Sequence, residues 1–375
     1  MARQRYGSGS MVERGEGVWR LRAYVRESDR QVHRTFRGNA TEAAKALAKF
    51  VTEVEQGRFD HTKATVGDLL DKWMAQIEPT RRPSTLLGYR RKIDHDIRPA
   101  LGIVSLAKLK PDRLDRFYGE QLARGLSSAT VRQMHAIISA ACHQAVKWGW
   151  ITVNPAERAS PPAVRSPKMI VPAFDEIDTL YRAARDYDPV LGTAVALAGL
   201  TGARRGELAA LRWSDVDLAA GRVSISRAIS VVDGMTFEGP TKTHQARMIA
   251  LDEAGVGVLR DRWAFMVDLS ERAESPLVAD PFVLSYQAHG GTPVSPDTIT
   301  HRFATIAKAT GIDCRLHSLR HFSVTTLIAT GVDIRTVAER HGHAQATMTL
   351  NRYAHALPER DRIAAGVLGR AIKTA

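Results

Sequence analysis

The chain has 375 residues, of which 44% are apolar, and this predicts two or three domains with buried apolar cores. It contains no apolar run long enough to span a bilayer, and its first residues lack the hydrophobic segment of a signal peptide, so we expect a soluble cytoplasmic protein without membrane contact. The formal net charge of +13 lies almost entirely in residues 1–165, where 29 Lys and Arg stand against 17 Asp and Glu, whereas residues 166–375 hold 24 against 23.

A basic half joined to a balanced half is typical of a module that binds nucleic acid, attached to a module with a different task. A basic surface that only serves solubility, or that binds an anionic membrane, is the alternative, although no basic amphipathic helix stands out. The two cysteines, Cys142 and Cys314, lack paired-ligand spacing, which excludes a disulfide framework and a zinc ribbon.

Residues 1–63 predict a small sheet followed by one helix. Apolar and basic residues alternate after Gly17, and a second extended run ends near residue 37, which indicates a β-hairpin or a three-stranded sheet. Thr41 is the expected cap of an alanine-rich helix over residues 42–56. The arginines of the sheet are candidates to enter a DNA groove, with a solvated β-face as the alternative. They are Arg20, Arg22, Arg26, Arg34 and Arg37.

Residues 64–160 predict a helical domain, and residues 161–172 a proline-containing linker. One helix starts at Thr65, and a second follows Pro83 with Ser84 or Thr85 as its cap. Pro111 opens a third helix, and residues 127–130 open a fourth that runs to residue 148.

Residues 173–375 predict a mainly helical domain with a small antiparallel sheet. Helices are expected over residues 175–185 and 189–200, and the second is apolar all round and therefore buried. Residues 222–232 alternate as a strand, Asp233-Gly234 predicts a hairpin turn, and a returning strand begins at Arg247. Helices dominate after residue 252. The fold class is therefore α+β with several domains.

Cutting a phosphodiester without a metal requires a nucleophile, donors that hold the phosphoryl oxygens, and an acid for the leaving alkoxide. Arg204, in Thr201-Gly-Ala-Arg204-Arg-Gly-Glu207, and Arg320 lie on separate helical segments, and guanidinium is suited to hold two phosphate oxygens at once. Glu207 is placed to orient a guanidinium or to cap the next helix. No Asp and Glu cluster with two-metal spacing is present, so we expect arginines to provide the electrostatic stabilisation.

Two histidines are candidates for hydrogen bonds and proton transfer at the same phosphate. His317 lies three residues before Arg320 and shares its helical face, and His343 follows later in the chain. His317 with His321 also has the i, i+4 spacing of zinc ligands, but no glutamate lies between them and a clear third ligand is lacking.

Lys242 and Tyr353 complete the set as acid and nucleophile. Lys242, at the tip or edge of the predicted hairpin, is suited to protonate a leaving 5′-oxygen if nearby arginines lower its pKa, although a solvated loop lysine is the usual alternative. A tyrosine has an ordinary pKa of about 10, so Tyr353 requires a cationic pocket or a base to attack at neutral pH.

The order and spacing of these motifs resemble those of tyrosine recombinases of the phage integrase family. The resemblance assigns the first arginine box to Arg204, the hairpin lysine to Lys242, the His-x-x-Arg box to His317 and Arg320, the Gly-His box to His343, and the nucleophile to Tyr353. It departs at His341, where the family usually has leucine, which predicts an additional imidazole beside the site. Residues 64–160 resemble the core-binding domain, and residues 1–63 the arm-binding domain of integrases that hold two classes of DNA site.

The resemblance implies a transesterification in which Tyr353 forms a 3′-phosphotyrosyl link and frees a 5′-hydroxyl, with no cofactor. It also implies four protomers on double-stranded DNA, which hold core sites and arm sites. A host DNA-bending protein and an excision factor are possible partners. The expected function is integration of a phage or similar mobile element into a bacterial chromosome, with the enzyme at the nucleoid of the host cell.

Four other functions are compatible with parts of the sequence. A chromosome-dimer resolvase uses the same chemistry, but such enzymes resemble residues 64–375 only. A type IB topoisomerase shares the tyrosine and the arginines. A sequence-specific DNA-binding protein without catalysis would explain the charge distribution alone, and a metal hydrolase would use the two helical histidines.

Overall fold

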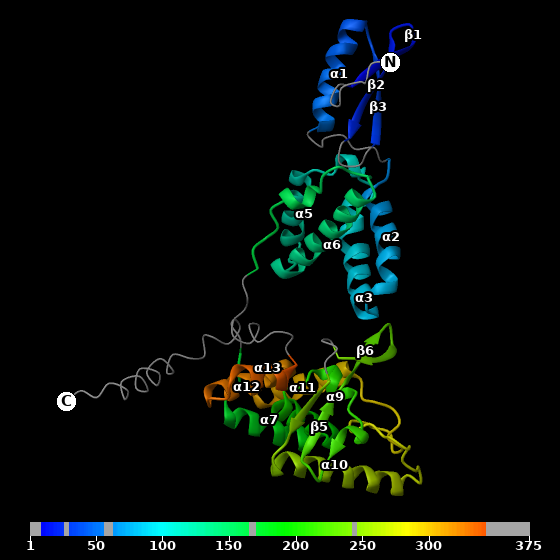
Figure 1. The fold of residues 1–375 in the computed structure, drawn as a ribbon. Helices are drawn as coiled ribbons and strands as arrows, with labels where there is room; N and C mark the ends of the chain where they lie inside the picture. The colour runs from blue at the N-terminus through cyan, green and yellow to red at the C-terminus, as the bar shows by residue number, and fades with distance from the viewer. Residues whose placement is uncertain (1–8, 26–29, 56–62, 165–169, 242–245, 343–375) are drawn as a thin grey trace, which may run out of the picture. The chain divides into compact units, whose positions relative to one another are not determined.

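The computed structural model describes residues 9–25, 30–55, 63–164, 170–241 and 246–342 (Figure 1). The chain divides into two compact units, Met1–Ser166 and Pro167–Ala375. Within the described ranges, none of the helices combines the length and the apolar character that a bilayer crossing requires.

The first unit begins with an antiparallel sheet of three strands in the order β1-β2-β3, with α1 packed on one face (Figure 1). These elements are β1 (Ser10–Gly15), β2 (Val18–Val25), β3 (Arg30–Arg37) and α1 (Ala40–Glu55). Their separate core contains Leu21 from the sheet and Phe50 from α1, both fully buried. The predicted sheet is confirmed, but the predicted cap is wrong. Asn39, and not Thr41, accepts the hydrogen bond of the Glu42 amide, and Glu42 reciprocates in a capping box.

The rest of the first unit is helical and has its own core. It comprises α2 (Val66–Ile77), η2 (Glu78–Thr80), α3 (Pro83–Lys92), the π-turn η3 (Ile93–Ile97), α4 (Arg98–Leu101), η4 (Leu106–Lys108), α5 (Pro111–Ala123), α6 (Ser128–Lys147) and η5 (Pro155–Arg158). The starts at Thr65, Pro111 and Ser127 are confirmed. Neither Ser84 nor Thr85 is a cap, because α3 already begins at Pro83, whose missing N–H costs nothing in a first turn.

The second unit is mainly helical, with two small antiparallel sheets. Its helices are α7 (Phe174–Tyr187), α8 (Pro189–Thr201), α9 (Arg205–Ala209), η6 (Trp213–Asp215), α10 (Glu253–Arg272), α11 (Pro296–Thr310), α12 (Leu316–Ala329) and α13 (Ile334–His341). Its strands are β4 (Val216–Asp217), β5 (Arg222–Ile225), β6 (Arg227–Val232), β7 (Met235–Pro240) and β8 (Arg247–Ala250). These elements confirm the predicted α+β class.

Helix α8 is the central element of this unit, as its apolar sequence predicts. It packs against α7, α10, α11 and α12. Asp188 caps its first turn, and Gly202 ends it in the left-handed conformation with φ +61°. The turn after Gly202 therefore projects from a rigid, buried base.

The predicted strand over residues 222–232 is two strands that belong to different sheets. β5 pairs with β4 and β8, whereas among the described strands β6 pairs with β7 across the Asp233-Gly234 turn. Both turn residues have positive φ, as a two-residue hairpin of this type requires. Lys242 follows β7 in the chain, so it is not at the tip of this hairpin, and it lies outside the described residues.

Candidate active site

Arg204 lies immediately before α9, in the turn that follows Gly202. Its backbone N–H donates to Glu207 Oε2 at 3.0 Å, and its Nη1 donates to Glu207 Oε1 at 2.8 Å. Glu207 therefore caps α9 and orients the guanidinium, which are the two roles that the sequence predicted for it. The Arg204 side chain is 26% exposed, whereas that of Glu207 is fully buried.

Glu207 also binds a second arginine, Arg247, which comes from β8. Arg247 Nη2 donates to Glu207 Oε2 at 2.6 Å, and the arginine side chain is only 7% exposed. Burial by itself would raise the pKa of the Glu207 carboxyl, but the hydrogen bonds and charges of Arg247 and Arg204 outweigh burial and hold that pKa below its usual value. The carboxylate thus remains ionised between two guanidinium groups.

Arg320, on α12, is buried and reaches two backbone carbonyls that are distant in sequence. Nη1 donates to Gly202 O and Nη2 donates to His341 O. These bonds connect α12 to the turn that carries Arg204 and to the end of α13. The structure therefore brings together the two arginines that the sequence proposed as phosphate ligands, from positions more than 100 residues apart.

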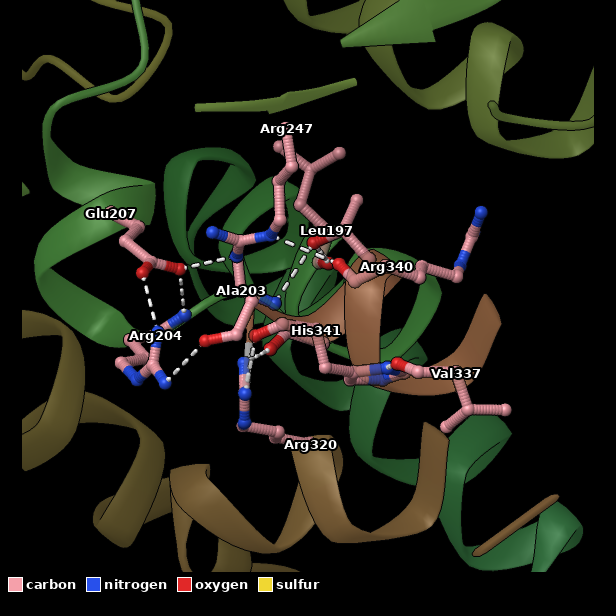
Figure 2. A network of polar contacts seen from close by, with 12 residues as sticks. Leu197, Ala203, Arg204, Glu207, Arg247, Arg320, Val337, Arg340 and His341 are labelled. Atoms are coloured by element: carbon pink, nitrogen blue, oxygen red, sulfur yellow. Dashed lines mark hydrogen bonds and ion pairs between the residues drawn. The ribbon is translucent and has the colours of Figure 1, made fainter. Parts of the chain in front are cut away.

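The end of α13 is where the three arginines meet (Figure 2). Arg247 Nε donates to Arg340 O at 2.9 Å, Arg320 Nη2 to His341 O, and Arg204 Nη2 to Gly342 O at 3.3 Å. The last carbonyls of a helix have no partner within the helix and carry its negative dipole end. The carbonyls of residues 340, 341 and 342 each accept a hydrogen bond from one guanidinium, and the last of these residues directly precedes His343.

His317 lies on α12 one turn before Arg320, as predicted, and its side chain is exposed. Its ring makes an edge contact with His321, with 4.7 Å between ring centroids. Among the described residues, no group of three or more His, Cys, Asp or Glu side chains is arranged to hold a metal ion.

His341 is fully buried, which corrects the expectation of an additional imidazole beside the site. Its Nδ1 bonds to Val337 O at 2.8 Å and its Nε2 to Ser323 Oγ at 3.1 Å. A carbonyl only accepts, so Nδ1 carries the proton in this arrangement and Nε2 accepts from the serine. The ring packs against Gly202, where a Cβ atom would lie 2.3 Å from His341 Cδ2. The His341 side chain is therefore part of the core, and its backbone carbonyl accepts a hydrogen bond from Arg320.

Three predicted site residues, Lys242, His343 and Tyr353, lie outside the described residues. Arg247 was not predicted from the sequence to be part of the cluster. A signal was present, because Arg247 and Ile249 alternate with exposed residues on β8 and so point to the same buried face. An arginine in phase with a core isoleucine indicates a buried acidic partner.

The sheet of the first unit separates its basic residues between two faces. Arg34 lies opposite Leu21 on the face that α1 covers, and it pairs with Glu53 at 2.8 Å. Arg20 and Arg22 alternate with Leu21, so they lie on the uncovered face. Arg37 on β3 lies opposite Val18, which is on the same face of β2 as Arg20 and Arg22. Arg34 is therefore not part of the uncovered basic face, contrary to the predicted set, and Arg26 lies outside the described residues.

Two family models match the chain. Residues 173–360 match the model described as the phage integrase family, and residues 65–120 match the phage integrase N-terminal SAM-like domain. Among curated proteins, a tyrosine recombinase XerC-like protein of Caldanaerobacter subterraneus is 23% identical and aligns over 93% of this chain and 95% of its own length. The ICEBs1 integrase of Bacillus subtilis is also 23% identical, over 86% of this chain and 87% of its own.

Solved structures with a similar fold include two integrases. The Tn1549 transposon integrase in complex with a circular intermediate DNA superposes with a TM-score of 0.70 at 20% identity, over 81% of this chain and 99% of that one. Lambda integrase, as a tetramer bound to a Holliday junction, superposes with a TM-score of 0.58 at 18% identity, over 92% of this chain and 96% of that one. At these identities the similarity establishes the fold.

Proposed function

The chain belongs to the phage integrase family of tyrosine recombinases, and from this we propose that it integrates a phage or similar mobile element into a bacterial chromosome. Its substrate in this proposal is double-stranded DNA with a specific crossover sequence. The observation that supports it best is the convergence of Arg204 and Arg320 on adjacent carbonyls of residues 341 and 342, directly before His343.

In the proposed reaction Tyr353 attacks the scissile phosphate and forms a 3′-phosphotyrosyl bond, and the 5′-oxygen leaves. Arg204 and Arg320 stabilise the charge that builds on the phosphoryl oxygens. His343 donates a hydrogen bond to the same phosphate, and His317 assists proton transfer. Lys242 protonates the leaving 5′-oxygen. The freed 5′-hydroxyl then attacks the phosphotyrosyl bond of a partner duplex, so the bond energy is conserved.

Each domain has a proposed task in binding DNA. Residues 64–160 and 173–375, joined by the linker of residues 161–172, would hold the core site. Residues 1–63 would bind an arm site through Arg20, Arg22 and Arg37 on the uncovered sheet face. Two rounds of strand exchange require four active sites, so the working assembly would be a homotetramer on DNA at the bacterial nucleoid, in the cytoplasm. A host DNA-bending protein and an excision factor are further proposed partners.

The test is covalent complex formation on a duplex from the DNA that flanks the coding region, chosen by a search of that DNA for an inverted-repeat core. We expect wild type and Tyr187→Phe to form a protein–DNA adduct and Tyr353→Phe to form none. Tyr187 is a matched control because its side chain is 57% exposed on α7. Undiminished adducts with Tyr353→Phe would reject the nucleophile, and sequence-specific binding without any wild-type adduct would favour a non-catalytic DNA-binding protein.

A further inference from the structure

We propose that Arg247 is a positioning residue for DNA cleavage, which sets both the net charge and the geometry of the phosphate-binding arginines without touching DNA itself. The proposal rests on the proposed function, because it concerns the same site. Arg247 lies on β8, outside the segments that carry Arg204 and Arg320.

Arg247 is too deeply buried to reach DNA. The Arg247 side chain is 7% exposed, and two of its three nitrogens are engaged, Nη2 with Glu207 and Nε with Arg340 O. A guanidinium held in this way acts through its neighbours. Arg204, by contrast, is 26% exposed and holds Gly342 O through the longest bond of the cluster, at 3.3 Å. Arg204 is thus the member of this group that is able to turn toward a phosphate.

Arg247 also sets the net charge around Arg204. Glu207 carries one negative charge and contacts both Arg204 and Arg247, so the three side chains together carry a net charge of +1. Without Arg247, the carboxylate would neutralise Arg204, and that pair would offer no net charge to a phosphate. Coulomb interactions are strong in a buried cluster that water screens poorly. Arg247 therefore leaves Arg204 free to act as a cation.

Arg247 also fixes the position of the chain at the end of α13. Arg247 supports the end of α13, since its Nε donates to Arg340 O and its guanidinium packs against Gly342. A Cβ atom at Gly342 would lie 3.0 Å from Arg247 Nη1 and 3.3 Å from Cζ. The chain continues from Gly342 to His343 and Tyr353. Removal of this support would misplace the start of the segment that carries two proposed catalytic groups, and a displacement of about 1 Å can reduce a rate about 100-fold.

The experiment measures single-turnover adduct formation by the full chain, at saturating protein, on the flanking-DNA duplex nicked beside its crossover point. For Arg247→Met we expect a rate loss of about 10- to 100-fold, with the dissociation constant for the same duplex changed by less than about threefold. Arg247→Lys keeps the charge and should recover part of the rate. Arg262→Met is the matched control, because Arg262 is also a buried arginine that donates two hydrogen bonds, in its case to the backbone carbonyls of Val283 and Ser285.

A double-mutant cycle distinguishes positioning from loss of folding. If Arg247 acts by offsetting Glu207, then Arg247→Met should slow cleavage much less in a Glu207→Gln background than in wild type, whereas Arg262→Met should have the same small effect in both. Cleavage rates are normalised to the folded fraction measured by thermal melting. If Arg247→Met does not fold, Arg247→Lys replaces it in the same cycle, and a smaller loss of cleavage rate is expected.

Two results would overturn the inference. One is a wild-type cleavage rate for Arg247→Met, or for Arg247→Lys if that variant has to replace it. The other is a rate loss that is fully additive with that of Glu207→Gln. Absence of any adduct with wild type would instead reject the proposed function, so the two failures are distinguishable.

Discussion

Replacing Glu207 by alanine should be among the most damaging single changes in the second unit. The substitution removes a fully buried carboxylate that accepts hydrogen bonds from Arg204 N at 3.0 Å, Arg204 Nη1 at 2.8 Å and Arg247 Nη2 at 2.6 Å. Arg247 would then be a buried charge without its counter-ion. Removing one partner of such a pair costs about 3–5 kcal/mol of unfolding free energy.

A loss of about 4 kcal/mol corresponds to a fall in Tm of about 8–16 °C for a unit of this size. Calorimetry of the full chain at pH 7 measures it. The control is Glu253→Ala, which removes an 87% exposed partner of Arg260 and should shift Tm by no more than about 2 °C. The combined change of Glu207→Leu and Arg247→Met should be less destabilising than Glu207→Ala, because no unpaired charge remains. Equal Tm shifts for Glu207→Ala and Glu253→Ala would refute this reasoning.

Three further predictions follow from other contacts. The pKa of Glu207 is lowered in the folded state, so its contribution to the unfolding free energy is complete above the usual carboxyl pKa of 4.5 and is lost as the pH falls below that value. In melting curves, the Tm difference between wild type and Glu207→Gln should therefore shrink below that pH. Gly202→Ala should lower the unfolding free energy by about 2–4 kcal/mol, because the φ of residue 202 is +61° and the new Cβ would clash with the His341 ring; thermal melting measures the loss. Arg22→Ala should reduce the slope of log affinity against log salt by about 1 in DNA titrations, whereas Arg34→Ala should leave it unchanged.

Local signals in the sequence were sufficient where a single side chain determines the structure. The helix starts predicted at Thr65 and at residues 127–130 are confirmed, and there the side chains of Thr65 and Ser127 each accept the hydrogen bond of the third following amide. Thr41 was wrong because Asn39, two residues earlier, is a better cap with Glu42 in the reciprocal position. Alternation over residues 222–232 did not reveal the division into β5 and β6, since pairing partners distant in sequence decide where one strand ends.

The candidate site could be predicted only in part from the sequence, for the same reason. Arg204 and Arg320 were found through motif order, and Glu207 through its spacing from Arg204. The contacts that unite them join residues separated by 118 and 138 positions, as in Arg320 with Gly202 and Arg204 with Gly342. No periodicity encodes such contacts. They arise because α8 and α12 pack together and α13 packs on α12.

The helix end that gathers the arginines explains how guanidinium groups persist in a largely buried site before any phosphate arrives. An arginine buried without acceptors would cost several kcal/mol, and backbone carbonyls provide acceptors at fixed positions without adding a negative charge. A carboxylate at each place would compete with a phosphate for the same cation, whereas a carbonyl is a weaker, neutral partner. The carboxylate of Glu207 lies in the arginine cluster of Figure 2, and two arginines share it. The cluster therefore keeps its positive charge while its geometry is fixed. In the proposed reaction, Arg204 is the arginine best placed to exchange a carbonyl for a phosphate oxygen, because it has the longest carbonyl bond and a partly exposed side chain.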